Sequence, residues 1–314
     1  MEKLVLIDGN AIIHRAYHAL PKTMTNRKGQ PTNAVYGFTT TLIKVLEDLK
    51  PEYIAASFDL AGPTFRHEHY KEYKATRVKS DQELYDQIPK VKEIVETMHI
   101  PIYEKAGFEA DDCLGTIVEK MKSKDVEVYI VSGDKDIFQL INGKVFVYSL
   151  RKGLSQMQVI DHDNIQLEYG LDPHDFIDLK ALAGDPSDNI PGVPGIGPKT
   201  ATDLIQRFDT MEKMYEVIET ADIKPRIKDL LINYKEQAFM SHKLATIHRD
   251  VPIDFDLEKC KFGGYDKLEL QKLFEELGFK SLLHRFGIME VGAYPTARKS
   301  TPEQKKKDEQ LKLL

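Results

Sequence analysis

Short apolar runs that stop at an aspartate are the feature that most constrains how this chain folds. Residues 4–7 run into Asp8, residues 53–58 into Asp59, and residues 128–133 into Asp134. Longer stretches with helical spacing separate these runs, an alternation that is typical of a parallel sheet. The sequence therefore predicts an α/β fold with a mainly parallel central sheet flanked by helices. We expect strands at 4–7, 53–58, 128–132 and 145–148, and helices near 34–49, 84–99 and 111–122.

Nine acidic side chains fall in five groups, most of them where an apolar run ends. The carboxyl ends of parallel strands share one edge of a sheet, where ligands bind, so we expect these acids to converge there. Carboxylates packed together repel one another unless cations neutralise them, and an all-oxygen ligand set favours Mg²⁺ or Mn²⁺. An acidic helix N-cap at 109–112 is the alternative, but it explains only one or two of the acids. The predicted metal ligands are Asp8, Asp59, Glu109, Asp111, Asp112, Asp134, Asp136, Asp185 and Asp188.

The length and net charge of the chain do not exclude a polyanionic substrate. The 314 residues suffice for about two domains. The formal charge is −6, from 44 basic and 50 acidic residues, yet nine of the acids belong to the predicted metal site. Local charge is therefore a better guide than the total. The sequence has no apolar run of about 18 residues, the first residues enter a strand rather than a signal peptide, and two cysteines fit a reducing compartment. We expect a cytoplasmic protein with no membrane partner.

Residues 64–80 carry five basic side chains against two acidic ones, a formal charge of +3, with aromatic residues between them. Basic groups neutralise phosphates, and aromatic rings stack on unpaired bases. A charge run of this kind is more often a solvated helix face, so both interpretations stay open. The basic residues are Arg66, Lys71, Lys74, Arg77 and Lys79, and the aromatic ones are Phe65, Tyr70 and Tyr73.

A glycine-rich turn opens an apolar helix at residues 192–201. Gly195, Gly197 and Lys199 stand in the order Gly-x-Gly-x-Lys, followed by Thr200. Open backbone N–H groups at a helix start, with a lysine beside them, can grip a phosphate without reading sequence. The spacing is not that of a Walker loop. A plain structural corner is the alternative. After the glycine-rich turn and its helix, the sequence indicates small helices at 209–289 and a basic linker or tail at 291–314.

Together these motifs resemble the bacterial 5′-nucleases of the flap endonuclease superfamily, over roughly residues 1–289. The likeness is greatest to the 5′→3′ exonuclease domain at the N-terminus of DNA polymerase I. It rests on the segments 6–10, 73–77, 109–112, 133–136 and 184–192. The resemblance implies a PIN-like or resolvase-like nuclease core at 1–184, with a helical arch at about 60–108. It further implies a duplex-binding α-helical region at 185–289 with a helix–three-turn–helix, and a basic tail or linker at 290–314.

The activity implied by the resemblance is that of a structure-specific 5′→3′ exonuclease and 5′-flap endonuclease. It would hydrolyse DNA phosphodiester bonds by a two-metal mechanism, in primer or flap removal during replication and repair. The first five acids, Asp8 to Asp112, would hold the catalytic ion, and the remaining four a further ion. Mg²⁺ is the implied ion, Mn²⁺ a substitute, and K⁺ is implied at the helix–three-turn–helix. The implied catalytic cations are Lys74, Arg77 and Arg15, and the implied DNA-binding residues are Tyr73, Gly195, Gly197, Lys199 and Thr200.

The implied substrate is DNA with a free 5′ end or a 5′ flap on duplex, bound by a monomer. Whether a polymerase follows in the same chain or acts as a separate partner stays open. A smaller PIN-type nuclease would lack the basic segment and the glycine-rich turn. A phosphatase of the haloacid dehalogenase type needs Asp-x-Asp after its first strand, whereas this chain has Asp8-Gly9-Asn10. A catalytically weak DNA-binding subunit that uses only the turn remains the main alternative, and a cleavage assay separates the two.

Overall fold

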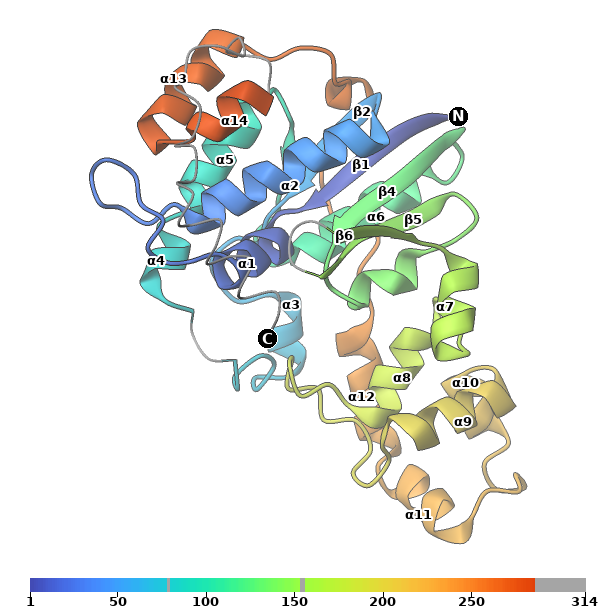
Figure 1. Cartoon of the computed structure of the whole chain (residues 1–314). Helices are drawn as coiled ribbons and strands as arrows, with labels where there is room; N and C mark the ends of the chain where they lie inside the picture. The colour runs from blue at the N-terminus through green and yellow to red at the C-terminus, as the bar shows by residue number, and fades with distance from the viewer. Residues whose placement is uncertain (78–79, 153–155, 286–314) are drawn as a thin grey trace, which may run out of the picture.

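The structure is a computed structural model that describes residues 1–77, 80–152 and 156–285. Its six strands form one sheet in the order β3-β2-β1-β4-β5-β6. Figure 1 labels five of them, from β2 through β1, β4 and β5 to β6. All neighbouring pairs from β3 to β5 are parallel, and β6 is antiparallel to β5. The prediction of a mainly parallel sheet is therefore confirmed. The strands are β1 (Glu2–Asp8), β2 (Tyr53–Ser57), β3 (Ile102–Tyr103), β4 (Val126–Ser132), β5 (Val145–Lys152) and β6 (Gln156–Ile160).

Helices cover both faces of the sheet because successive residues of each buried strand point to opposite faces. In β1, Val5 and Ile7 belong to a core shared with α1 (Gly9–Ala19), α2 (Asn33–Leu49), α5 (Ile88–Thr97), α13 (Lys267–Leu277) and α14 (Lys280–Arg285). Leu4 and Leu6 face the opposite core, which includes α6 (Ala110–Met121), the 3₁₀ helix η1 (Asp136–Leu140) and α7 (His162–Tyr169). This three-layer arrangement fixes the edge at which the strands end.

The expected strands and two of the three expected helices agree with the structure within a few residues. The predicted helix at 84–99 is instead two helices, α4 (Gln82–Tyr85) and α5. Pro89 stands in the first turn of α5, where its missing N–H leaves no helical hydrogen bond unmade. The apolar residues keep their helical spacing across the boundary between α4 and α5, so the spacing alone could not reveal that boundary. Preceding these helices, the basic segment contains the short helix α3 (Phe65–His69).

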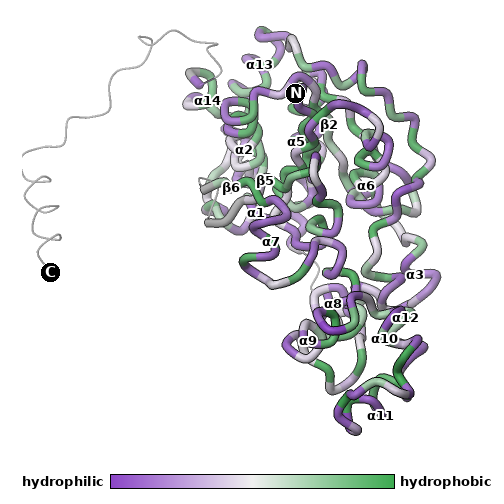
Figure 2. The backbone as a smooth tube through the Cα atoms, turned by 90° about the vertical axis from the view of Figure 1, so that its right-hand side faces the viewer, coloured by the Kyte–Doolittle hydropathy of each residue, from purple (hydrophilic) through white to green (hydrophobic). Residues whose placement is uncertain are grey.

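A separate helical unit lies at one end of the molecule, away from the sheet (Figure 2). It consists of α8 (Asp175–Ala183), α9 (Pro198–Phe208), α10 (Met211–Glu216), α11 (Pro225–Asn233) and α12 (Lys235–Ala245). Its buried core joins residues of α8 to those of α9, α10 and α12. The unit therefore begins before residue 185, where the sequence suggested a boundary.

No helix in the described ranges is long and apolar enough to cross a bilayer. The basic tail expected at 290–314 lies outside the described residues.

Candidate active site

Asp8 and Ser132 end the neighbouring strands β1 and β4, between which the order of the sheet reverses. Such a switch point is the usual ligand site of an open parallel sheet. The Ser132 hydroxyl donates a hydrogen bond of 2.6 Å to Asp8 Oδ2, and the Ala11 N–H donates one of 3.0 Å to Asp8 Oδ1. Asp8 thereby caps α1 and is held in one orientation.

The N-terminus of α6 delivers further carboxylates to the same edge. Glu109 is the N-cap of α6, and Asp111 lies in its first turn. Asp59, just beyond β2, accepts a 2.7 Å hydrogen bond from the Ala110 N–H, so β2 and α6 are tied together at this point. A cavity of about 230 Å³ results. It is lined by Asp8, Asn10, Ala11, His14, Asp59, Lys74, Arg77, Glu109, Ala110, Asp111 and Asp134.

The electrostatics of this cavity suit a cation. Burial, opposed by the hydrogen bonds from Ser132 and Ala11 and reinforced by the nearby acids, raises the pKa of Asp8 to about 7. Burial also raises the pKa of Asp111 well above its usual range, and repulsion from Asp8, Asp134 and Asp59 adds to it. A bound divalent cation would relieve both effects. The all-oxygen carboxylate set therefore fits a hard metal ion.

Asp112 is turned away from this cavity. Its side chain is fully buried, and both of its oxygens accept hydrogen bonds from Arg66, with Nη1–Oδ2 and Nη2–Oδ1 distances of 2.8 Å. The Glu109 N–H donates to Oδ2 at 3.0 Å and the His248 N–H to Oδ1 at 2.8 Å. Each oxygen thus already accepts two hydrogen bonds. The sequence placed Asp112 with the inner metal ligands, whereas in this structure it serves a buried ion pair.

A second cavity, of about 570 Å³, adjoins the first at Ala11 and Asp134. Arg15, Asp136, Lys180 and Asp185 also line it. Lys180 Nζ forms an ion pair with Asp136 and lies 2.5 Å from Asp185 Oδ2. Burial and repulsion from Asp134 raise the pKa of Asp136 to about 7 despite Lys180. Burial would raise the pKa of Asp185 too, but Lys180 and Ser187 hold it below its usual value.

Asp188 joins the acids to the basic segment. Arg77 forms an ion pair with Asp188, and Lys74 Nζ lies 2.8 Å from Glu109 Oε1 and 3.7 Å from Asp188 Oδ2. The Lys74 N–H donates to the Asp188 carbonyl at 2.8 Å, with Lys74 in the left-handed backbone region (φ 57°). Burial acts to raise the pKa of Asp188, but Lys74 and Arg77 hold it below its usual value. The basic segment is therefore docked on the acidic loop.

Tyr73 differs from its expected role. Its ring is 3% exposed, and its hydroxyl donates to Asp188 Oδ2 at 2.9 Å and lies 3.2 Å from Glu109 Oε2. A ring buried in this way cannot stack on a terminal base, so the stacking prediction is wrong for this conformation. Tyr73 instead orients two of the carboxylates.

The loop that carries Asp185 and Asp188 is closed by its own backbone. Asp185 and Ile190 exchange two N–H···O bonds of 2.9 Å each. Gly192 has φ +60°, and a Cβ there would lie 2.2 Å from the Gly184 nitrogen. Only glycine therefore permits this close crossing of the two ends of the loop.

The glycine-rich turn leads into α9 as expected. Gly195 has φ +87°, which favours glycine, and Gly197 is the N-cap of α9 in extended conformation. Lys199 is exposed at the start of α9, and Thr200 beside it is half-buried. Backbone donors and a lysine are therefore available at a helix N-terminus.

Two cations of the site were not identified as site residues from the sequence. Lys180 had no sequence signal, because it is a single lysine on a helix whose other side chains are apolar residues and two aspartates. Arg66 was counted in the basic segment, but nothing local indicated that its partner would be Asp112, 46 positions further along the chain. A buried long-range pair is visible only once the fold is known.

Two family models match consecutive parts of the chain. The 5′-3′ exonuclease N-terminal resolvase-like domain matches residues 3–170, and the 5′-3′ exonuclease C-terminal SAM fold matches residues 171–268. DNA polymerase I of Bacillus subtilis is 43% identical over 286 residues, which are 91% of this chain and 32% of that protein. DNA polymerase I of Caldicellulosiruptor bescii is 38% identical over 301 residues, 95% of this chain and 35% of that protein. The chain thus spans about a third of the length of these relatives.

Solved structures share the fold. A T5 5′-exonuclease structure with bound zinc superposes with a TM-score of 0.65 at 21% identity, covering 88% of this chain and 99% of that one. The catalytic core of Rad2 in complex with a DNA substrate superposes with a TM-score of 0.57 at 19% identity, covering 92% of each chain. The fold is that of a metal-dependent nuclease. The chain belongs to the 5′-3′ exonuclease family.

Proposed function

We propose that this protein hydrolyses phosphodiester bonds of DNA next to a free 5′ end or a 5′ flap. One observation carries the proposal: carboxylates delivered by β1, β2, β4 and α6 line a single cavity that Lys74 and Arg77 also line. Such a cavity can hold divalent cations and a phosphate together. A site for a phosphate alone would not need the carboxylates, and a site for a metal cation alone would not need Lys74 and Arg77.

Divalent ions, when bound, would activate water and stabilise the leaving oxygen of an in-line displacement. We assign the first ion to Asp8, Asp59, Glu109 and Asp111, which surround the smaller cavity. We assign the second ion to the acids around Asp136. Asp134 belongs to this second set and lies where the two cavities adjoin. Mg²⁺ is the ion we propose, with Mn²⁺ as a substitute, because all the ligands are oxygens. The second set is Asp134, Asp136, Asp185 and Asp188.

The basic residues would then hold the scissile phosphate. Lys74 and Arg77 contact Glu109 and Asp188, and metal ions at these carboxylates would free both cations for phosphate oxygens. Arg15 lines the adjoining cavity and would contact a neighbouring phosphate. Guanidinium and ammonium groups near the scissile bond stabilise the charge that develops in the transition state.

Asp112 and Tyr73 take positioning roles in this proposal. Asp112 holds Arg66, and with it the α3 part of the basic segment, and also accepts a hydrogen bond from the N–H of Glu109. Tyr73 fixes the orientation of Glu109 and Asp188 through its hydroxyl. Neither side chain needs to touch a metal ion or DNA to affect the rate.

Duplex DNA would be gripped behind the cavity by the turn that opens α9. Gly195 and Gly197 leave the backbone open, while Lys199 and Thr200 add polar groups for phosphate oxygens. Main-chain carbonyls of this turn are our proposed K⁺ site. A monomer suffices for this arrangement, because every residue of both sites comes from one chain.

In the cell, we propose a cytosolic role in removing primers and flaps during replication and repair. The relatives carry about two thirds of their length outside the matched part. A DNA polymerase, in the same chain or as a partner, would therefore supply the 5′ ends that this nuclease removes. We propose a nuclease core that includes β1 to α7, whose segment 60–108 arches over the site, and a duplex-binding region that begins with α8 rather than at residue 185. After it, α13 and α14 return to the core of the nuclease part, and 290–314 is the proposed tail or linker.

Cleavage of a 5′-labelled flap duplex in Mg²⁺ tests the proposal. We expect cutting near the flap junction by the wild type, loss of cutting in Asp111→Asn, and retained DNA binding by that variant. A duplex with a blocked 5′ end is the control substrate and should be cut slowly. Flap binding without cleavage by the wild type would favour the non-catalytic DNA-binding subunit instead.

A further inference from the structure

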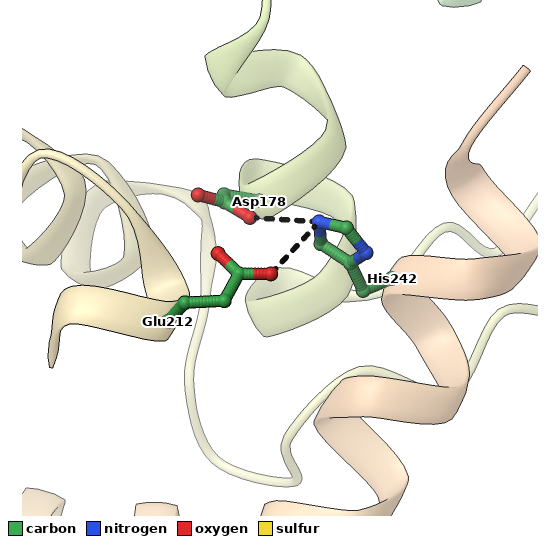
Figure 3. Close-up of side chains that lie close together, drawn as sticks. All are labelled: Asp178, Glu212 and His242. Carbon is green, nitrogen blue, oxygen red and sulfur yellow. Dashed lines mark ion pairs between the residues drawn. The ribbon is translucent and has the colours of Figure 1, made fainter. Parts of the chain in front are cut away.

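Three chemically suitable side chains meet in the helical unit, outside both acid-lined cavities. Asp178 on α8, Glu212 on α10 and His242 on α12 point toward one another (Figure 3). His242 Nε2 lies 3.4 Å from Asp178 Oδ1 and 3.5 Å from Glu212 Oε1. One oxygen or nitrogen of each residue lies within 4.8 Å of those of the other two. Three helices thus present ligand atoms to a common point.

Asp178 provides the observation that points to a ligand. The residue is 4% exposed, and its Oδ2 accepts a 2.8 Å hydrogen bond from the Met211 N–H. Its Oδ1 is buried and has no hydrogen-bond partner among the residues that the structure describes. A buried carboxylate oxygen without a partner is costly, so such atoms in native proteins call for an explanation. This oxygen faces the other two side chains.

We propose that Asp178, Glu212 and His242 bind a divalent transition-metal cation of the Zn²⁺ type. Ligand atoms at Zn²⁺ bond lengths of about 2.0–2.1 Å are about 3.3 Å apart in a tetrahedron. The two distances from His242 are close to this value. Imidazole suits Zn²⁺ and its neighbours, whereas Mg²⁺ prefers oxygen ligands alone. Three protein ligands leave one position for water.

The competing explanation is a protonated His242 that pairs with two carboxylates. That arrangement would give Asp178 Oδ1 a charge-assisted hydrogen bond, expected at about 2.7–2.9 Å. The observed 3.4 Å is longer, and Oδ1 makes no hydrogen bond within the described part of the chain. A metal ion between the three atoms satisfies Oδ1 at the observed spacing without drawing the helices together.

A metal ion at this site would hold α8, α10 and α12 together. These helices share the core of the unit that contains the α9 turn. Metal that binds only the folded unit stabilises it in proportion to ligand concentration. The inference does not depend on cleavage activity, because its readouts are metal binding and thermal stability.

The test is a Zn²⁺ titration of the metal-stripped full chain in excess Mg²⁺. Binding is measured by calorimetry and by the change in Tm, and the absorption spectrum of added Co²⁺ is a second probe. The acid-lined cavities are unchanged in every variant, so their Zn²⁺ binding is common to all. We expect the wild type to show one saturable Zn²⁺ site beyond any Zn²⁺ bound in the acid-lined cavities. We also expect a rise in Tm with Zn²⁺ and the intense visible bands of tetrahedral Co²⁺. His242→Gln and Glu212→Gln should lose all three signals.

Glu216→Gln is the matched control, because Glu216 is an exposed acid one turn further along α10. It should behave as the wild type. Glu212 is 49% exposed at its side chain, so its amide variant has no buried packing to lose if His242→Gln fails to fold. The proposal is overturned if the wild type shows no additional site, or if Glu212→Gln keeps it. Either result would leave an ion-paired triad.

Discussion

Arg66 and Asp112 form a bidentate ion pair whose side chains are 3% and 0% exposed. Arg66 also donates to the carbonyl oxygens of Leu244 and Thr246 at 2.9 Å each. The pair thereby joins α3, the start of α6, and the end of α12 with the residue that follows it. Residues far apart in the sequence are fixed beside the cavity by one fully satisfied pair, and such pairs specify a unique arrangement.

Breaking this pair should cost stability. We expect Asp112→Asn to lower the free energy of unfolding by about 3–5 kcal/mol, because it leaves the buried Arg66 charge without its counter-charge. Urea unfolding of the metal-free protein measures this loss. Asp111→Asn is the comparison, since it removes repulsion among the cavity acids and should leave metal-free stability equal or higher. Equal stability of both variants would contradict the structural role of Asp112.

The stability of metal-free protein should depend on pH through Asp8 and Asp136. Burial raises the pKa of both carboxyls from 3.8 to about 7, so the folded state binds more protons than the unfolded state between these values. Stability should therefore fall as pH rises from about 4 to about 7. Asp185 and Asp188 act in the other direction, but their pKa values are lowered, so their effect lies below about pH 4.

Urea unfolding at several pH values in a chelator tests this dependence. Asp8→Asn should flatten the fall, and the free-energy difference from wild type should grow with pH. Excess Mg²⁺ should reverse the slope, because the metal binds the deprotonated carboxylates. A metal-free stability that rises steadily from about pH 4 to 7 would refute the raised pKa of Asp8.

The sequence predicted the sheet and the convergence of acids because both follow from local patterns. Apolar runs mark strands, and topology brings their ends to one edge. Asp8, Asp59 and Asp134 are therefore found together as expected. Asp112 and Tyr73 were misplaced because resemblance assigns a residue to a motif, whereas burial and partners decide which way its side chain points. The Asp178–Glu212–His242 group had no motif, since its members meet only through the packing of three helices.

Lys180 should compete with metal ions. Its ammonium group neutralises Asp136 and Asp185, so Lys180→Met should strengthen Mn²⁺ binding at the second set of acids by roughly tenfold. Electron paramagnetic resonance of free Mn²⁺ during a titration measures the affinity. Lys135→Met, which lies on the same cavity, is the matched control and should have a smaller effect. Weaker binding in Lys180→Met would show that the lysine instead holds the acids in place.

Gly192→Ala should disturb the loop that presents Asp185 and Asp188. The new methyl group would lie 2.2 Å from the Gly184 nitrogen in a backbone region unfavourable for alanine, so a loss of about 2 kcal/mol or more is expected. Mn²⁺ binding at the second set should weaken as well. Gly197→Ala is the control, since a Cβ there meets open space and its φ is negative. Unchanged Mn²⁺ binding in Gly192→Ala would separate the loop from the metal site.

Lys199 offers a quantitative test of the proposed duplex grip. If its exposed ammonium group contacts a DNA phosphate, Lys199→Ala should weaken binding equally across sequences and reduce the slope of log K against log salt by about one unit. Fluorescence anisotropy over a range of KCl concentrations measures this slope. Lys122→Ala, at the C-cap of α6, should leave it unchanged, because that lysine is exposed and pairs with Glu119 of α6. A parallel shift in affinity with the wild-type slope would mean that Lys199 shapes the turn without touching phosphate, and the grip would then rest on the backbone donors of Gly197 and its neighbours.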